Sequence, residues 1–322
     1  YSSKKMSYAK AFLNEYSQTH IKGYLGFFDV LGYKDLISNN KLDDVIDIYN
    51  RTLLNLAEKA ILIEGKHDYA RIEGKEPVKY LAFSDTIILY QDESLYIPKI
   101  DLKNHALIEI QSLKIFMETV SYLLRLSFER GIPIRGAVSY GRYYATERGC
   151  FLGMPIIEAY KMEQAQDWAG AVICRSVQDK FHNIGRELTR DLKRGNINIP
   201  KEMPYLGAYS SPSDLRNRAL IYAIAQSLAP YSVPYNSKLS ENKIDVAFCW
   251  DDVFIEWLGI ESLPKFDPDD DDSIREKVEE KFKSHNKSVE KTDIRTKIKN
   301  TSDFIIHLNQ IHKKNISSNY GR

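Results

Sequence analysis

The chain has 322 residues, of which 43% are apolar and 28% charged, as in an ordinary globular protein. These figures exclude a disordered or collagen-like chain, and the length predicts two domains or one domain with large additions. The 45 Lys+Arg and 44 Asp+Glu residues leave a net charge of +1, which excludes a global basic field, so we expect no nucleic-acid partner.

The hydrophobic pattern predicts alternating strands and helices between residues 22 and 183. The first strand is an apolar, aromatic run that ends at Gly32. A helix follows, and then two short strands whose link, Ser84-Asp85, is typical of a tight turn. A long helix that ends at Gly131 and a fourth strand complete the unit. The predicted ranges are 23–30, 78–83, 86–90 and 134–141 for the strands, and 43–57 and 104–130 for the helices.

This β-α-β-β-α-β order predicts an α+β, ferredoxin-like core with helices on one face of its sheet. A further helix at 155–166 and a strand at 169–174 follow. Beyond residue 183 the pattern is less regular, with a helix expected at 215–229, a strand at 244–250 and a final helix that includes 304–311. We therefore expect an N-terminal extension (1–21), a core domain (22–183) and an appended, mostly helical C-terminal subdomain (184–322).

Two aspartates stand at strand ends that this fold places side by side. Asp29 lies near the end of the first strand, and Asp85 lies in the hairpin turn. Two adjacent carboxylates repel each other, and both stay ionised where cations lie between them. Their oxygens suit Mg²⁺ or Mn²⁺, and paired metals assist displacement at phosphorus. The alternative is that Asp29 caps the helix entry and Asp85 only forms the turn.

Four segments, taken in order, resemble a known family. FFDVLG, FSDTIIL, RGAVSYG and GMPIIEAYKME are similar to the FxDxxGF, hairpin GD, RxGxxxG and GxxVNxAxRxE motifs of class III nucleotidyl cyclases. Their order and spacing carry this resemblance, which covers about half of the chain. The F-x-D-x-L-G opening, the hairpin S-D and the segment 231–234 (Y-x-V-P) more closely resemble divergent bacterial cyclase-homology proteins, a group that includes the anti-phage pyrimidine cyclases.

The resemblance implies roles for individual residues. Asp29, Asp85 and the Val30 carbonyl would hold two Mg²⁺ or Mn²⁺ ions. Arg135 matches the arginine of RxGxxxG, and Lys161 falls where the family has its transition-state arginine. The substrate would be a nucleoside triphosphate, and the site would be shared between the two protomers of a homodimer.

Three further positions depart from the family pattern. The ribose-orienting asparagine falls on Ile157, which cannot hydrogen-bond a ribose. The base-reading positions fall on Leu81 and Cys150, a pair that is neither the Lys/Asp of adenylyl cyclases nor the Glu/Cys of guanylyl cyclases. The identity of the base therefore stays open.

Other residues have plain structural explanations. Arg135 could pair with a surface carboxylate, and Cys150 could be a small buried residue, since no histidine is placed near it. Glu158 and Glu163 are five positions apart and are not expected to form an acid/base pair. The acidic run at 267–272 lacks the glycine and terminal glutamate of a calcium loop, so we interpret it as a solvated loop.

The cellular context is only broadly constrained. No apolar run approaches the roughly 20 residues that a membrane-spanning helix needs. Three cysteines without CxxC spacing argue against a disulfide scaffold or a zinc site, and the first ten residues are charged, so a cytoplasmic location is expected.

Three functions remain open. The first is a metal-dependent cyclase that makes a 3′,5′-cyclic nucleotide and pyrophosphate, with pyrimidine specificity and a role in anti-phage signalling as a finer hypothesis. The second is a degenerate cyclase-homology protein that binds a nucleotide or a partner without turnover, which Ile157 and Lys161 favour. The third is a palm-type polymerase, whose GGDD-type hairpin the sequence lacks.

Overall fold

A computed structural model describes residues 21–50, 69–70, 78–93, 97–98, 105–145, 151–194, 228–236, 244–248 and 271–319. Residues 1–20 of the expected N-terminal extension and most of the expected helix at 215–229 lie outside these residues, and Ile21 belongs to the first strand. The last two residues of that expected helix are described, and they belong to a strand, β9 (Leu228–Ser232).

The expected βαββαβ unit is present, and its strands lie in the order β3-β4-β1-β6. They are β1 (Ile21–Val30), β3 (Val78–Phe83), β4 (Thr86–Gln91) and β6 (Ile134–Ala145). Each neighbouring pair is antiparallel, and the β3–β4 hairpin pairs through β4 with β1. The α+β fold class predicted from the sequence is confirmed.

The sheet continues beyond this unit. β8 (Gly170–Ile173) pairs in parallel with β6, and β10 (Ile244–Phe248) and β9 follow it in antiparallel pairs. β7 (Phe151–Leu152) pairs with the far end of β6, and β2 (Tyr69–Ala70) with β5 (Ile97–Pro98) forms a separate small sheet. Residues after 183 therefore contribute strands to the central sheet. The domain boundary at 183 stays a prediction, and one helix, α7 (Arg175–Lys193), runs across it.

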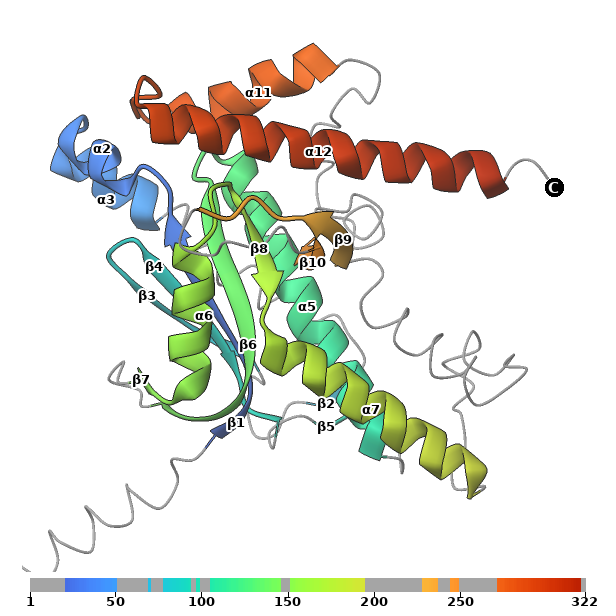
Figure 1. Ribbon diagram of the computed structural model, residues 1–322. Helices are drawn as coiled ribbons and strands as arrows, with labels where there is room; N and C mark the ends of the chain where they lie inside the picture. The colour runs from blue at the N-terminus through green and yellow to red at the C-terminus, as the bar shows by residue number, and fades with distance from the viewer. Residues whose placement is uncertain are drawn as a thin grey trace, which may run out of the picture.

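Helices cover both faces of the sheet (Figure 1). Tyr24 and Phe28 of β1 belong to a core that includes α5 (His105–Glu129) and α7. Leu25 of β1 belongs to a second core with α6 (Met154–Gln164) and with Trp168. The expectation of helices on one face is therefore wrong for α6, because alternate side chains of β1 are apolar on both sides.

The first helix begins closer to the end of β1 than the sequence pattern predicts. α2 (Tyr33–Ser38) begins directly after Gly32, whose left-handed φ of 77° turns the chain out of the strand. α3 (Leu42–Ile48) follows, and the rest of the predicted helix at 43–57 lies largely outside the described residues.

Two C-terminal helices cross the end of the sheet where β1 finishes (Figure 1). They are α11 (Asp271–Lys283) and α12 (Thr292–Asn319). Helix α11 is rich in charged residues, but its Ile274, Val278 and Phe282 are buried in a core with Leu31 and Phe128. Asp271 and Asp272, expected in a solvated loop, lie in the first turn of α11. Their negative charges interact favourably there with the positive end of the helix dipole.

Helix α12 is tied to the central sheet by an aromatic cluster. Phe304 is fully buried, and its ring meets that of Trp168 edge-on at 4.5 Å. Trp168 also stacks on Tyr231 of β9 at 5.5 Å. The C-terminal helices are thus part of the hydrophobic core that supports the end of β1.

We expect Phe304→Ala to destabilise the protein by about 3–5 kcal/mol, because it leaves a cavity against Trp168. Leu42→Ala is the control, since Leu42 is 70% exposed and should change stability by about 0.5 kcal/mol or less. Urea denaturation followed by tryptophan fluorescence measures both. Equal small effects would show that α12 is not part of the core.

Candidate metal and nucleotide site

The structure brings Asp29 and Asp85 to the same end of the sheet. Asp29 lies opposite Thr86 of β4 and Arg135 of β6 in the strand registers. The turn between β3 and β4 consists of Ser84 and Asp85, and Ser84 adopts a left-handed φ of 55°. The backbone N–H of Val30 donates a hydrogen bond of 2.8 Å to the Asp85 carbonyl, which fixes the turn beside the end of β1.

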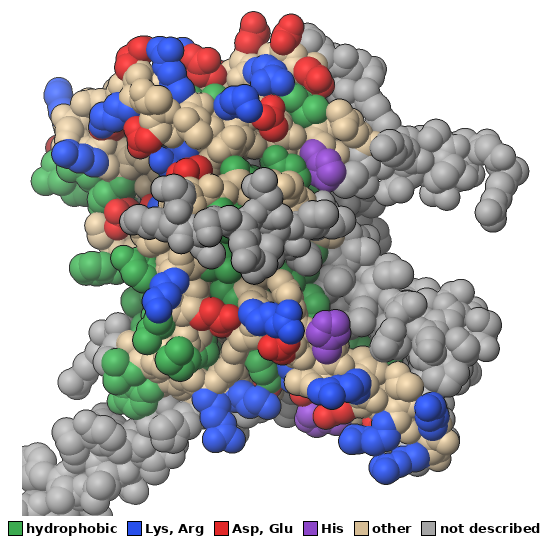
Figure 2. All heavy atoms as spheres, viewed as in Figure 1, with side chains coloured by type: hydrophobic (Ala, Val, Ile, Leu, Met, Phe, Trp, Pro, Cys, Tyr) green, Lys and Arg blue, Asp and Glu red, His purple; other side chains and the backbone are tan. Residues whose placement is uncertain are grey.

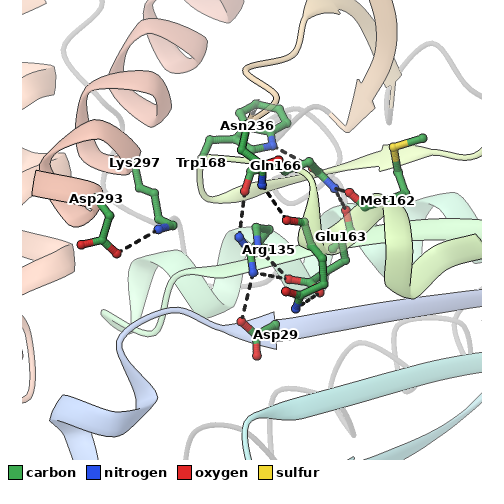
Figure 3. Close-up of polar contacts among 11 residues, drawn as sticks. Asp29, Arg135, Met162, Glu163, Gln166, Trp168, Asn236, Asp293 and Lys297 are labelled. Atoms are coloured by element: carbon green, nitrogen blue, oxygen red, sulfur yellow. Dashed lines mark hydrogen bonds and ion pairs between the residues drawn. The ribbon is translucent and has the colours of Figure 1, made fainter. Parts of the chain in front are cut away.

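Arg135 connects Asp29 to the end of α6 (Figure 3). Its Nε donates to Glu163 Oε1 at 2.6 Å, and its Nη2 lies 2.6 Å from the same oxygen. Nη1 donates to the Gln166 carbonyl at 2.8 Å, and Nη2 lies 3.6 Å from Asp29 Oδ2. The Arg135 side chain is 11% exposed and that of Glu163 is fully buried. Such a charge-assisted pair is strong and sets the direction of the guanidinium.

The strand itself makes room for this arrangement at Gly136. A Cβ atom there would lie 2.2 Å from Cδ1 of Phe28 and 2.7 Å from the Phe27 carbonyl oxygen. A side chain at this position would displace the Phe28 ring and with it the end of β1. The glycine that follows Arg135 therefore keeps Asp29 and Arg135 in register.

Gln166 fixes the segment that follows α6. Its Nε2 donates to the Gly136 and Met162 carbonyls, both at 2.9 Å, and its Oε1 accepts a hydrogen bond from Trp168 Nε1 at 2.8 Å. With the amide and the backbone both engaged, Gln166 holds its own carbonyl in place for Arg135.

The Y-x-V-P segment braces the same turn from the other side. The Pro234 carbonyl accepts from the Asp167 N–H at 2.9 Å, and the Asn236 N–H donates to the Ala165 carbonyl at 2.7 Å. Asn236 Nδ2 also donates to the Gln164 carbonyl at 2.8 Å. The segment is therefore a structural support for the turn that holds Arg135.

Glu163 and Gln166 were not predicted as site residues. Glu163 was considered only as a partner of Glu158, and the structure places the two glutamates in different contacts. Glu158 accepts from the Ser176 hydroxyl at 2.6 Å at the start of α7, whereas Glu163 pairs with Arg135. The signal that could have found Glu163 is the terminal glutamate of the fourth motif together with its burial on α6.

Three carboxyl groups crowd this end of the sheet. The pKa of Asp29 is raised from 3.8 to about 7; burial is the largest cause, Glu163 and Asp85 add to the rise, and Arg135 and Lys297 oppose it. Burial also raises the pKa of Glu163, against the lowering effect of Arg135. Because burial and two neighbouring carboxyl groups oppose the ionisation of Asp29, a cation beside Asp29 and Asp85 would stabilise their charged forms, and hard oxygen donors fit Mg²⁺ or Mn²⁺.

A second cluster of possible metal ligands lies elsewhere in the described structure, and its ligand atoms are close together. Among the residues that the structure describes, one set of three ligand atoms from His, Cys, Asp or Glu lies within 4.8 Å of one another: His105, Glu109 and Glu187. The Nδ1 atom of His105 lies 3.7 Å from Glu109 Oε1. Glu109 is also paired with the buried Lys180, so a cation there would compete with an existing ion pair.

The other predicted residues lie away from the Arg135 network. Leu81 is half-buried in β3, opposite Ile88. Ile157 is 45% exposed, and Lys161, one helical turn further along α6, is also exposed. Cys150 lies outside the described residues. The structure thus gathers Asp29, Val30, Asp85 and Arg135, and it leaves Ile157 and Lys161 on the outer face of a helix.

Comparison with known proteins finds only remote likenesses. No family model and no curated protein matches the chain. Three solved structures are similar over about half of it. The first is the monomeric guanylyl cyclase domain of the RhoGC fusion protein from the aquatic fungus Blastocladiella emersonii, with 12% identity, coverage of 51% of this chain and 87% of that domain, and a TM-score of 0.34.

The second is the catalytic core of a rhodopsin-guanylyl cyclase with converted specificity in complex with ATPalphaS, with 14% identity, 50% and 81% coverage and a TM-score of 0.33. The third is a non-canonical dimeric form of the Blastocladiella domain, with 14% identity, 51% and 85% coverage and a TM-score of 0.31.

The raised pKa of Asp29 predicts a pH-dependent effect of Asp29→Asn. Between pH 4 and 7 the folded protein retains a proton on Asp29 that the unfolded chain releases. The free energy of unfolding therefore falls as the pH rises from about 4 to 7, and it stays lowered above pH 7. The neutral asparagine avoids this loss. We expect the variant to exceed the wild type in stability by up to about 3 kcal/mol at pH 8, and to match it at pH 4.

Thermal unfolding in EDTA at both pH values measures this difference without bound metal. Asp44→Asn is the control, because Asp44 is exposed on α3. A variant that is less stable than the wild type at pH 8 would contradict the crowding of carboxylates at this site.

Proposed function

We propose that the protein is a metal-dependent nucleotidyl cyclase, which converts a nucleoside triphosphate into a 3′,5′-cyclic nucleotide and pyrophosphate. The observation that carries the proposal is the meeting of Asp29 and Asp85 at one end of the sheet, with the Val30 N–H bound to the Asp85 carbonyl at 2.8 Å. The order of the four sequence motifs supports it, since each falls on the element that the resemblance requires.

Asp29, Asp85 and the Val30 carbonyl would hold two Mg²⁺ or Mn²⁺ ions. Bound there, the ions would lower the pKa of the ribose 3′-hydroxyl and neutralise the phosphates. In the reaction the 3′-oxygen loses its proton and forms a bond to the α-phosphorus, while the bond from that phosphorus to the pyrophosphate oxygen breaks. The protein supplies position and charge for this in-line displacement.

Arg135 has a positioning role in this proposal. Its guanidinium is committed to Glu163, to the Gln166 carbonyl and to Asp29. It therefore directs the Asp29 carboxylate and holds the end of α6 against β1. Lys161 is the exposed cation of the fourth motif, and it lacks the planar fork with which arginine binds phosphate.

We also propose that α6 serves a second copy of the chain in a homodimer. Large apolar side chains are exposed on and around α6, and Figure 2 shows hydrophobic groups gathered along this edge of the molecule. They are Leu152 (63%), Met154 (71%), Ile157 (45%) and Tyr160 (48%), with Phe83 (76%) on the hairpin. Exposed apolar patches mark interaction surfaces. Dimerisation would bring Ile157 and Lys161 of one protomer to the Asp29–Asp85 pair of the other.

The finer features of the function rest on the sequence resemblance. They are a pyrimidine substrate, anti-phage signalling, and contact of Leu81, Cys150 and Ile157 with the base and ribose. A cytoplasmic location rests instead on the cysteine pattern and the charged first residues. None of the described helices is long and apolar enough to cross a membrane.

A binding module without turnover is the second candidate, and one observation favours it. Ile157 replaces the ribose-binding asparagine, and its side chain is exposed on the same face of α6 as Lys161. A pocket with this residue can enclose a nucleotide but offers the ribose no hydrogen bond at that point.

The product of the reaction tests the two candidates directly. We expect one or more of the four nucleoside triphosphates, incubated with the protein and Mn²⁺, to yield a cyclic nucleotide and pyrophosphate that mass spectrometry identifies. Asp29→Ala and Asp85→Ala should each lower the rate by at least about 10³-fold, because each removes a metal ligand. Asp44→Ala, on exposed α3, should retain the wild-type rate.

Full turnover by Asp29→Ala would refute the cyclase assignment. Binding of a nucleotide by the wild type without any product would instead establish the binding module.

The dimer has its own prediction. Met154→Glu should convert the dimer to a monomer, because it places a charge in the apolar patch on α6, and sedimentation velocity measures the change. Leu42→Glu alters an equally exposed side chain on α3 (70% against 71%) and should leave the dimer intact. A wild type that is monomeric at the assay concentration, or a Met154→Glu variant that still dimerises, would contradict the proposal.

A further inference from the structure

Helix α12 lies against the end of the sheet that carries Asp29, and hydrogen bonds fix its position. The Ala169 N–H donates to Thr301 Oγ1 at 2.8 Å, and Asn300 Nδ2 donates to the Asp167 carbonyl at 2.7 Å. Both contacts are made to the turn after α6, close to Gln166. The helix is therefore held in a defined register over the site.

The loop between α11 and α12 contacts the backbone near Gly32 and Gly131, close to the same end of the sheet. Lys287 Nζ donates to the Gly131 carbonyl at 2.7 Å, and its stem lies against Gly32, where an added Cβ would come within 2.9 Å of Cδ. Asn286 Nδ2 donates a hydrogen bond of 2.8 Å to Asn40 Oδ1. These contacts anchor the segment that leaves β1 directly after Asp29.

Lys297 is a buried cation on the side of α12 that faces the site. The residue is 9% exposed, and Figure 3 shows it near Arg135 and Asp29 at this end of the sheet. Its hydrogen bond is a long one, 3.4 Å to Asp293 Oδ2, and that carboxylate is 65% exposed.

Three other cations in the described part of the chain, Arg135, Lys287 and Lys161, are committed elsewhere or face outward. Arg135 is held by three groups, Lys287 donates to a backbone carbonyl, and Lys161 is exposed on α6. Lys297 can leave Asp293 at little cost, because water solvates an exposed carboxylate well. A lysine ammonium on a flexible stem is a common phosphate ligand.

We propose that Lys297 is a phosphate-binding residue of the Asp29–Asp85 site, contributed by a C-terminal helix that lies outside the four motifs. When a polyphosphate binds, the ammonium moves from Asp293 to the phosphate oxygens. The ligand class, a triphosphate, rests on the proposed function; the presence of a polyanion-binding lysine does not require turnover.

Titration calorimetry with inorganic tripolyphosphate and Mg²⁺ tests the lysine without any catalytic step. We expect Lys297→Met, which keeps the stem and removes the charge, to weaken binding at least tenfold, and Lys297→Arg to restore most of it. Lys299→Met is the matched control. Lys299 is exposed and pairs with Asp303 four residues away, as Lys297 pairs with Asp293, and its loss should leave binding unchanged.

Asp293→Asn separates phosphate binding from a merely structural ion pair. If Lys297 binds phosphate, loss of its competing carboxylate should preserve or tighten binding. If the ion pair only holds α12, Asp293→Asn and Lys297→Met should lower the melting temperature and the affinity together, which would overturn the inference. Binding by a folded Lys297→Met within twofold of the wild type would also overturn it, and so would a wild type that binds no tripolyphosphate.

These outcomes are distinct from those of the cyclase assay. If the wild type makes a cyclic nucleotide and Lys297→Met leaves KM unchanged, the phosphate-binding role of Lys297 is refuted and the cyclase proposal is supported. If the wild type binds tripolyphosphate through Lys297 but forms no product, the cyclase proposal is refuted and the role of Lys297 is supported.

Discussion

The fully buried carboxylate of Glu163 depends on the guanidinium of Arg135, and the end of the sheet is organised around this pair. A buried charge is costly unless it is matched and hydrogen-bonded. Here the match comes from a strand residue, Arg135, and a helix residue, Glu163, so the pair locks α6 to β6. The remaining donors of Arg135 reach Gln166 and Asp29, which extends the same constraint to the turn after α6 and to the end of β1.

Much of this fold could be predicted from the chain alone, since strands such as 78–83 are bounded by strong turn signals and 134–141 follows a helix that ends at glycine. The convergence of Asp29 and Asp85 was predictable for the same reason, because the βαββ order places a hairpin turn beside the end of the first strand. Less could be predicted where local pattern and tertiary packing disagree. The charged segment at 271–283 reads as solvent-exposed, yet three residues on one side of it fill a core with Leu31 and Phe128.

The roles of Glu163, Gln166 and Lys297 could not be predicted, because they depend on contacts between distant segments. Glu163 acquires its role from a strand arginine 28 positions away. The Gln166 side chain is held by the Gly136 carbonyl, to which it donates, and by the Trp168 indole N–H, from which it accepts. Lys297 lies more than 100 residues beyond the fourth motif, and it comes to the site because the aromatic contact of Trp168 with Phe304 and the hydrogen bonds of Asn300 and Thr301 dock α12 there.

The position of α12 in the chain has a consequence for biosynthesis. A ribosome makes every described strand of the central sheet before it makes Thr301 and Phe304, so these strands can assemble before Phe304 covers Trp168. The Ala169 amide gains its hydrogen-bond acceptor, Thr301, and the indole gains its edge-on contact with Phe304, only when α12 emerges. This end of the molecule is therefore completed only after the described strands have been made, and the nascent chain lacks Lys297 until then.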